Sequence, residues 1–548
     1  MKANQFDPKV PRRTILLGGA SIFGTAAFGN RYLAACENFF RGKTREFKLD
    51  ARSASVEIAP GRTIQALTYD GKLPGTEIRV KEGERVRVAY KNNLPVESTI
   101  HWHGVHQTGT NNMDGVPEVT QKPIPSGGEM VYDFVANKPG TYFYHSHIGL
   151  DIERGLYAPL IVEPKNEPMS YDREHTLVLD DWLDGSPDLA FEQLKQGISP
   201  ADGVAKDSPQ AQSSGQRSPM GRGRGGRQSG MRRGGPPRGM GRRGGPPAGM
   251  GRGGPPTGKG MGRGHMGMGH GGFSQQSEIN YTTYLINGRA PEGAPDFPVK
   301  RGERVRFRVI NASGVTIFRV AIGGHKLTVT HSDGFPIQPV EASTFEIAPG
   351  ERYDFVITAS NPGAWPIAAV SVMEPGRGAR GIMRYTDAQA STVPPVNFQP
   401  KELSGKLLEL DDLLSPESLD FPLLTDRPDR IIDLAFGQSR RAYAWTIAGS
   451  SGSHGPFGIQ TGERVRVRMS GGMMMRMWHP MHLHGHSFRV VNGRGNRNTA
   501  VKDTVLVKPK MHGRVELEFL ANNPGNWLFH CHHAYHLAAG MECVFKYV

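Results

Sequence analysis

The sequence is poor in cysteine. Its 548 residues include three, Cys36, Cys531 and Cys543. If Cys531, which stands among histidines, binds a metal, at most one disulfide remains and a disulfide framework is excluded. Cys543 lies in an apolar final run, and we interpret it as a buried core thiol.

Long apolar runs and helical periodicity are also scarce. The apolar segment up to about residue 28 is too short and too rich in glycine and alanine for a transmembrane helix. Residues 187–197 are the best candidate for a helix. Hydrophobic residues make up 37% of the chain, and the mean hydropathy is −0.45. These low values indicate that part of the chain is not packed core.

Acidic residues are missing from one segment. Residues 208–277 hold eleven Arg, one Lys and no Asp or Glu, so they carry +12 of the net charge of +14. The rest of the chain is close to neutral. The basic balance therefore belongs to one segment, which weakens a nucleic-acid-binding interpretation of the whole protein.

That segment is part of a Gly/Pro/Arg-rich insert, residues 201–277, which cannot bury a core and is predicted to be disordered. Thioethers are soft ligands that favour Cu(I). The insert is therefore either a copper-collecting loop or a linker whose methionines are incidental; RGG-type RNA binding fits poorly with an exported protein. Its candidate ligands are Met220, Met231, Met240, Met250, Met261, Met266, Met268, His265 and His270.

The N-terminus carries an export pattern. Arg12 and Arg13 precede a short apolar run, which resembles a twin-arginine signal. We expect residues 1–45 to be a signal and leader read by the twin-arginine export machinery, with the mature protein in the periplasm. Leu33-Ala34-Ala35-Cys36 also resembles a lipobox, so a lipid anchor on Cys36 is a second possibility. A basic N-terminal helix is the alternative without export.

One unit recurs three times along the chain. A turn glycine followed by alternating polar and apolar residues appears at 83–88, 302–307 and 462–467, the pattern of a half-buried strand. About fifty residues later each copy has a Pro-Gly turn, at 138–140, 361–363 and 523–525. We predict an all-β protein of three antiparallel β-sandwiches at 46–166, 167–395 and 396–548, the second interrupted by the insert.

The repeats differ in their histidines. Five residues after the turn glycine stand His145 in the first copy, Ala368 in the second and His530 in the third. The outer copies carry histidine clusters and the middle copy does not. If the clusters share metals, the first and third domains must touch, with the second as a spacer.

The stretch from His530 to Met541 holds four His, one thiol and one thioether. A Cys with two His and a distant Met is the ligand set of a blue-copper site, although Cys and His also bind zinc. Neighbouring side chains of a strand point to opposite faces, so His530 and His532 should turn away from Cys531 toward other metals.

Three further histidine clusters lie at 101–103, 145–147 and 479–484. Each His-x-His pair places two rings on one strand face, which suits two adjacent metals. One such pair is weak evidence, but four of them in two related domains are specific.

With these motifs the chain resembles the three-domain multicopper oxidases, the family of laccases, ascorbate oxidase and bacterial cuprous oxidases. The resemblance implies three cupredoxin-like Greek-key domains and four copper ions, one type 1, one type 2 and two type 3. It implies His479, Cys531, His536 and axial Met541 at type 1, and His101 and His482 at type 2. The type 3 pair would be bound by His103, His145 and His532 on one ion and by His147, His484 and His530 on the other.

The resemblance also implies that a reductant gives single electrons to the blue copper and that the cluster reduces O2 to water. Asp114 matches the family's acidic residue near the cluster, so we expect it to assist proton delivery; a turn residue is the alternative. Leu537 departs from the Glu that many bacterial relatives have there. We interpret His106, His486 and His533 as supporting or surface groups.

The reductant is open at this stage. Met473, Met474, Met475, Met477 and Met481 flank His479 and are either core or a path for Cu(I). With the insert they favour a cuprous oxidase in copper tolerance over a laccase acting on phenols. A copper-binding protein would not need the His-Cys-His sequence, and a two-domain nitrite reductase would lack the paired cluster ligands. We expect a monomer that binds no nucleic acid.

Overall fold

The computed structural model describes residues 42–198, 277–388, 392–439, 442–449, 454–471, 477–509 and 514–548. Residues 1–41 of the predicted leader, including Cys36, nearly all of the insert and Met473 to Met475 lie outside these residues. Within the described ranges, no helix is long and apolar enough to cross a membrane.

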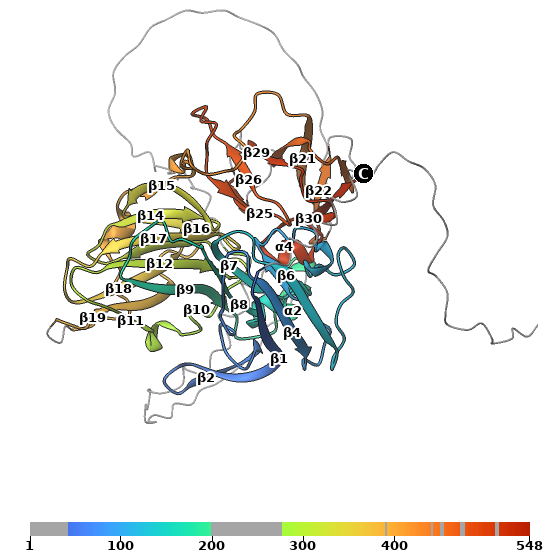
Figure 1. Ribbon diagram of the computed structural model, residues 1–548. Helices are drawn as coiled ribbons and strands as arrows, with labels where there is room; N and C mark the ends of the chain where they lie inside the picture. The colour runs from blue at the N-terminus through green and yellow to red at the C-terminus, as the bar shows by residue number, and fades with distance from the viewer. Residues whose placement is uncertain are drawn as a thin grey trace, which may run out of the picture. The chain divides into compact units, whose positions relative to one another are not determined.

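Six sheets, two to a sandwich, form the protein, and Figure 1 colours the three sandwiches from blue through yellow to red. This confirms the all-β prediction. Not every strand pair is antiparallel, because the opening strand of each sandwich runs parallel to the repeated strand: β1 with β4, β9 with β12 and β21 with β24.

The first sandwich has two four-stranded sheets, in the orders β2-β1-β4-β6 and β3-β8-β7-β5. Its elements are β1 (Thr44–Ala59), β2 (Arg62–Tyr69), β3 (Ile78–Lys81), β4 (Arg85–Asn92), β5 (His101–His103), η1 (Asn111–Met113), β6 (Glu129–Val135), β7 (Gly140–His145), η2 (Asp151–Arg154) and β8 (Tyr157–Glu163).

The middle sandwich has two six-stranded sheets, β10-β9-β12-β17-β14-β15 and β11-β19-β18-β13-β16-β20. Its elements are β9 (Arg173–Trp182), α2 (Pro187–Lys195), β10 (Thr283–Ile286), η3 (Pro291–Gly293), β11 (Asp296–Val299), β12 (Arg304–Asn311), β13 (Phe318–Ile322), β14 (Leu327–Ser332), β15 (Phe335–Ala342), β16 (Thr344–Ile347), β17 (Arg352–Thr358), β18 (Ala364–Ser371), β19 (Gly378–Tyr385), η4 (Lys401–Ser404) and β20 (Leu407–Leu408).

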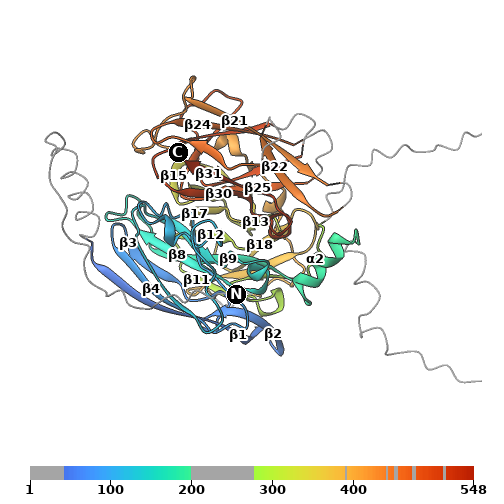
Figure 2. The ribbon, with the colours of Figure 1, turned by 90° about the vertical axis from the view of Figure 1, so that its right-hand side faces the viewer.

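The third sandwich has sheets of six and five strands, β22-β21-β24-β29-β26-β27 and β23-β31-β30-β25-β28, and Figure 2 shows β31, β30 and β25 side by side. Its elements are η5 (Leu410–Asp412), β21 (Arg430–Gln438), β22 (Trp445–Gly449), β23 (Phe457–Ile459), β24 (Arg464–Gly471), β25 (His479–Leu483), β26 (Phe488–Val491), β27 (Val501–Lys502), β28 (Thr504–Val507), β29 (Arg514–Leu520), β30 (Asn526–Cys531), α4 (Ala534–Ala538) and β31 (Glu542–Tyr547).

The repeated sequence forms the predicted strand in each sandwich, as β4, β12 and β24. In β4 buried and exposed residues alternate, as expected for a half-buried strand. In β12 Arg306 and Arg308 are buried as well, because both pair with the buried carboxylate of Asp354, while Arg304 at the start of the strand is exposed. The same pattern thus gives a half-buried strand in the first sandwich and an almost fully buried one in the middle sandwich.

The predicted helix is α2, which begins at Pro187 after the N-cap Ser186. The short helix α4 was not expected from the sequence. It follows β30 directly, with His533 as its N-cap accepting a hydrogen bond from the backbone N–H of His536. This helix turns the chain back so that residues on both sides of it converge.

Candidate metal centres

One centre lies inside the third sandwich. Cys531 ends β30, His479 begins β25, and His536 lies on α4. The Cys531 Sγ is 3.7 Å from His479 Nδ1 and 3.6 Å from His536 Nδ1, and all three residues are buried. Met541 is buried in the same core, and its carbonyl accepts a hydrogen bond of 3.0 Å from the Cys531 N–H. The structure thus brings together the four residues predicted for this centre.

The electrostatics of this centre suit a metal ion. Burial lowers the pKa of His536 to about 3, and burial followed by His536 lowers the pKa of His479 well below its usual value. Both rings therefore stay neutral and keep a lone pair for a ligand. Burial raises the pKa of the Cys531 thiol, so its thiolate requires a neighbouring cation.

A second centre is built from eight histidine rings on the first and third sandwiches. His101 and His103 come from β5, and His145 and His147 lie at the end of β7 and just after it. The third sandwich supplies His482, His484, His530 and His532 from β25, β30 and the residues that follow them. Ring centroids of His101 and His484 are 3.9 Å apart, and those of His103 and His482 are 3.8 Å apart. The outer sandwiches therefore meet at the histidines.

Several of the rings are oriented by a protein oxygen on one nitrogen. His101 Nδ1 lies 2.8 Å from the Asp114 carbonyl, His145 Nδ1 2.9 Å from the Ser146 carbonyl, and His482 Nδ1 2.9 Å from the Asp503 carbonyl. In the described part of the chain, the buried Nε2 of each of these three rings has no hydrogen-bond partner. His103 is reversed: its Nε2 faces Asp503, and its Nδ1 has no partner there.

Two rings face each other directly. The Nε2 atoms of His484 and His530 are 3.0 Å apart, while their Nδ1 atoms contact Asp114 Oδ2 at 2.8 Å and the Cys531 carbonyl at 3.0 Å. Because Nδ1 is the donor in each ring, two lone pairs point at one another. Burial and neighbouring rings lower the pKa of both imidazoles well below the usual value. A cation bound by both nitrogens removes this repulsion.

Asp114 lies where the sequence predicted it, against the cluster. It is fully buried, its carboxylate contacts His484, and its carbonyl orients His101. Leu537 is half-buried on α4.

The remaining predicted groups have defined places. His486 is buried and contacts the His484 carbonyl and the Tyr547 hydroxyl, and His106 contacts Ser487. His533 stacks on His536 with ring centroids 3.7 Å apart. Cys543 is a buried core thiol, as predicted. Met481 is a core residue, and Met477 packs against that core.

Sequence reasoning missed two residues. The Glu278 Oε2 lies 3.3 Å from His536 Nε2 and accepts a hydrogen bond of 2.6 Å from the Tyr443 hydroxyl. Asp503 Oδ1 lies 3.3 Å from His103 Nε2. Glu278 adjoins the low-complexity insert, and Asp503 lies in the bend between β27 and β28, where no histidine stands. Neither belongs to a ligand pattern, so the only signal is the tertiary fold.

Models of the multicopper oxidases match residues 50–167, 265–388 and 429–548. Multicopper oxidase MmcO of Mycobacterium tuberculosis is 33% identical to this chain over 514 residues, which cover 92% of this chain and 88% of that protein. The chain belongs to the multicopper oxidase family. Copper resistance protein A of Escherichia coli is 27% identical, over 97% of this chain and 98% of that protein.

Solved structures agree on the fold. The multicopper oxidase Fet3p, which functions in iron import, superposes with a TM-score of 0.68 at 19% identity, over 92% of this chain and 90% of that chain. The laccase from Botrytis aclada gives 0.66 at 23% identity, over 92% and 88%.

Membership of the family makes the protein a copper-dependent oxidoreductase that uses O2 as acceptor. The typical complement of the family is four copper ions, one type 1, one type 2 and two type 3. Zinc, the alternative left open by the histidine and cysteine pattern, is thereby set aside.

Proposed function

We propose that the single-sandwich centre is the type 1 site and that the eight rings hold the trinuclear cluster, with the ligands that the motifs implied. The buried ring nitrogens without a hydrogen-bond partner in the described residues support this proposal. A buried imidazole with one nitrogen oriented by the protein and the other unpaired is suited to bind a metal ion. His147, His484 and His530 offer nitrogens within 4.8 Å of one another, as do His101, His482 and His484.

Bound copper would supply one-electron transfer at the first site and O2 reduction at the second. The chain supplies the connection between them, because Cys531 is joined by peptide bonds to His530 and His532. The Asp114 carboxylate, 2.8 Å from His484 Nδ1, would assist proton delivery, and the burial of the cluster would exclude solvent from the reaction.

We propose Cu(I) as the reductant and copper tolerance as the role. The observation behind this is the carboxylate of Glu278, which stands between Tyr443 and His536 and has no Lys or Arg partner in the part of the chain that the structure describes. A carboxylate without a fixed cation at the electron-entry ring favours a cationic reductant over a neutral phenol. The relatives named for copper resistance support the same choice.

Oxygen uptake with Cu(I), Fe(II) and a dimethoxyphenol tests this proposal on the wild type and the Glu278→Gln variant. We expect KM for Cu(I) to rise about tenfold, equivalent to about 1.4 kcal/mol, with little change for the phenol. Glu192→Gln, which removes an exposed carboxylate on α2, is the control.

Equal losses with Cu(I) and the phenol would favour the laccase alternative. No oxygen uptake with any of the three reductants would favour a copper-binding protein.

We also propose twin-arginine export to the periplasm, on the strength of the Arg12-Arg13 pattern, and, separately, a monomeric state. Recovery of the mature protein in the cytoplasm after cell fractionation would contradict the export proposal.

A further inference from the structure

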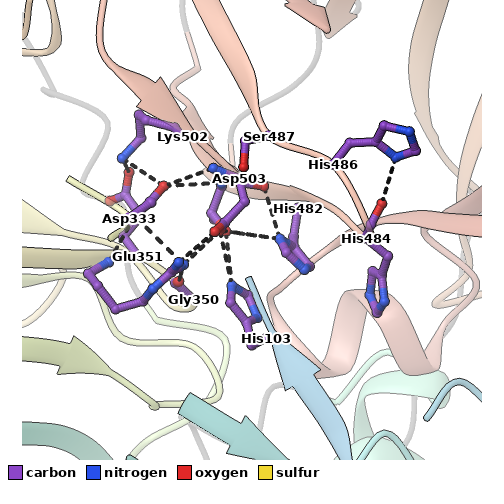
Figure 3. A network of polar contacts seen from close by, with 12 residues as sticks. His103, Asp333, Gly350, Glu351, His482, His484, His486, Ser487, Lys502 and Asp503 are labelled. Carbon is purple, nitrogen blue, oxygen red and sulfur yellow. Dashed lines mark hydrogen bonds and ion pairs between the residues drawn. The ribbon is translucent and has the colours of Figure 1, made fainter. Parts of the chain in front are cut away.

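A buried carboxylate lies behind two rings of the cluster. Figure 3 shows Asp503 with His103 and His482 on one side and Asp333 on the other. The Asp503 carboxylate contacts His103 Nε2 at 3.3 Å, and its carbonyl accepts from His482 Nδ1 at 2.9 Å. One residue therefore orients a ring of the first sandwich and a ring of the third.

Asp503 is itself held by the middle sandwich. Arg352, which begins β17, donates to both of its oxygens, with Nη1–Oδ1 at 2.6 Å and Nη2–Oδ2 at 2.5 Å. The same guanidinium donates from Nε to the Thr141 carbonyl of β7 in the first sandwich. Arg352 is fully buried and thus joins all three sandwiches at one point.

The surrounding charges are also paired. Asp333 accepts from the backbone N–H groups of Asp503 and Arg352, and Lys502 lies 3.0 Å from Asp333 and 3.2 Å from Glu351. Burial alone would raise the pKa of Asp503, but the Arg352 guanidinium and then the two rings lower it well below its usual value. Because both Asp503 oxygens accept hydrogen bonds from Arg352, the carboxylate is held as an acceptor toward the rings.

The middle sandwich also touches the cluster directly. Gly350 has φ +85, and a methyl group placed on it would lie 2.9 Å from His532 Cδ2 and 3.1 Å from His103 Cε1. The middle sandwich, which we expected from the sequence to be only a spacer, thus contacts the histidine cluster. Gly350 lies against two rings, and Arg352 binds Asp503.

We propose that Asp503, clamped by Arg352, is a positioning residue that fixes the tautomers and orientations of His103 and His482. An Asp503 oxygen that already accepts from Arg352 also accepts from His103 Nε2, which places the ring proton there and leaves the unpartnered Nδ1 for the metal. Through this clamp the ligand-free middle sandwich governs the affinity and geometry of the cluster. The inference rests on the copper assignment proposed above.

The test compares copper retention and spectra of full-length copper-loaded variants. For Asp503→Asn we expect cluster copper to be lost to a chelator at least about tenfold more readily, with an altered type 2 EPR signal. The blue absorption of the type 1 site should stay unchanged. Arg352→Lys keeps the charge but loses the bidentate hydrogen bond to Asp503, so the retention of cluster copper should fall by a smaller factor.

Arg306→Lys is the matched control, because Arg306 is a buried arginine of the same sandwich that grips Asp354 with two nitrogens. It should retain cluster copper like the wild type. If Asp503→Asn does not fold, the comparison of Arg352→Lys with Arg306→Lys decides.

Unchanged retention and EPR in Asp503→Asn, or equal losses in the two lysine variants, would overturn the clamp. A wild type that does not bind four coppers would instead contradict the copper assignment, so the two failures are distinguishable.

Discussion

The two metal centres differ in how much of the chain each needs. The Cys531 centre takes its groups from 479–541, within one sandwich. The histidine cluster takes half of its rings from residues 101–147 and half from 482–532, so two sandwiches must dock before it exists. The first centre depends on local folding and the second on an interface.

This difference explains the arrangement of supporting groups. Around Cys531 the chain folds back on itself, with Met541 and His536 joined by a backbone hydrogen bond of 2.9 Å. Around the cluster the supports cross sandwich boundaries, as Asp114 does toward His484. A shared centre needs such crossing contacts, because no single strand fixes the distance between rings of different sandwiches.

The largest expected effect comes from removing the thiolate. Cys531→Ser should abolish the blue absorption and reduce oxygen uptake to background, because a hydroxyl is a poor ligand for a soft metal. The cluster EPR signal should remain, since the eight rings are untouched. Absorption, EPR and oxygen uptake on copper-loaded protein measure the three properties.

Cys543→Ser is the control for this change, because Cys543 is buried one strand away in the same sheet. It should keep both centres. Retention of the blue absorption in Cys531→Ser would remove Cys531 from the type 1 site.

A smaller effect is expected at the cluster. Asp114→Asn preserves shape but removes the carboxylate beside His484, so kcat for oxygen uptake should fall by about 10²-fold, as for the loss of a general acid or base. The blue absorption should persist, and a change in the pH profile of kcat distinguishes proton delivery from a turn role. Asp180→Asn, a buried carboxylate held by Tyr157, is the control. An unaltered kcat and pH profile would contradict the assignment.

The contrast between local folding and contacts across an interface also separates what could be predicted from the sequence from what could not. The repeats located β4, β12 and β24, and period-two alternation placed His530 and His532 away from Cys531. The absence of a histidine at Ala368 indicated that the outer sandwiches meet. These inferences succeed because strand geometry is local and each pair of predicted ligands stands on one strand or at its end.

The supports could not be predicted, because they are single residues brought in by packing. Arg352 shares the alternating pattern of other strand arginines, yet its burial and its grip on Asp503 arise only when the sandwiches assemble. Glu278 contacts His536, which lies 258 positions later in the sequence, and Glu278 belongs to no ligand motif. The sequence therefore did not predict that the middle sandwich supports the histidine cluster.

A third contact between the sandwiches, at Glu153, is expected to depend on pH. The buried carboxyl of Glu153 on η2 accepts hydrogen bonds of 2.9 Å from Tyr281, at the entry to the middle sandwich, and of 3.3 Å from Tyr535 on α4. Burial and then the charge of Asp181 raise the pKa of Glu153 well above its usual value. In contrast to Asp503, whose carboxylate is gripped by Arg352, the Glu153 junction favours a neutral carboxyl.

The smallest expected effect follows from this raised pKa. Its stabilisation is complete below the unfolded pKa of about 4.3 and is lost as pH rises through the folded pKa, at up to about 1.4 kcal/mol per pH unit. Glu153→Gln keeps a neutral group, so its free energy of unfolding should decline less with rising pH than that of the wild type. Denaturant unfolding across pH measures this difference.

Glu303→Gln should show the opposite sign, because Arg173 lowers the pKa of Glu303 to about 2 and its stabilisation is lost as pH falls. Parallel pH curves for wild type and Glu153→Gln would mean that folding does not raise the pKa of Glu153. A steeper decline in the wild type would show that this junction, which reaches α4 through Tyr535, makes the contact between the sandwiches sensitive to pH.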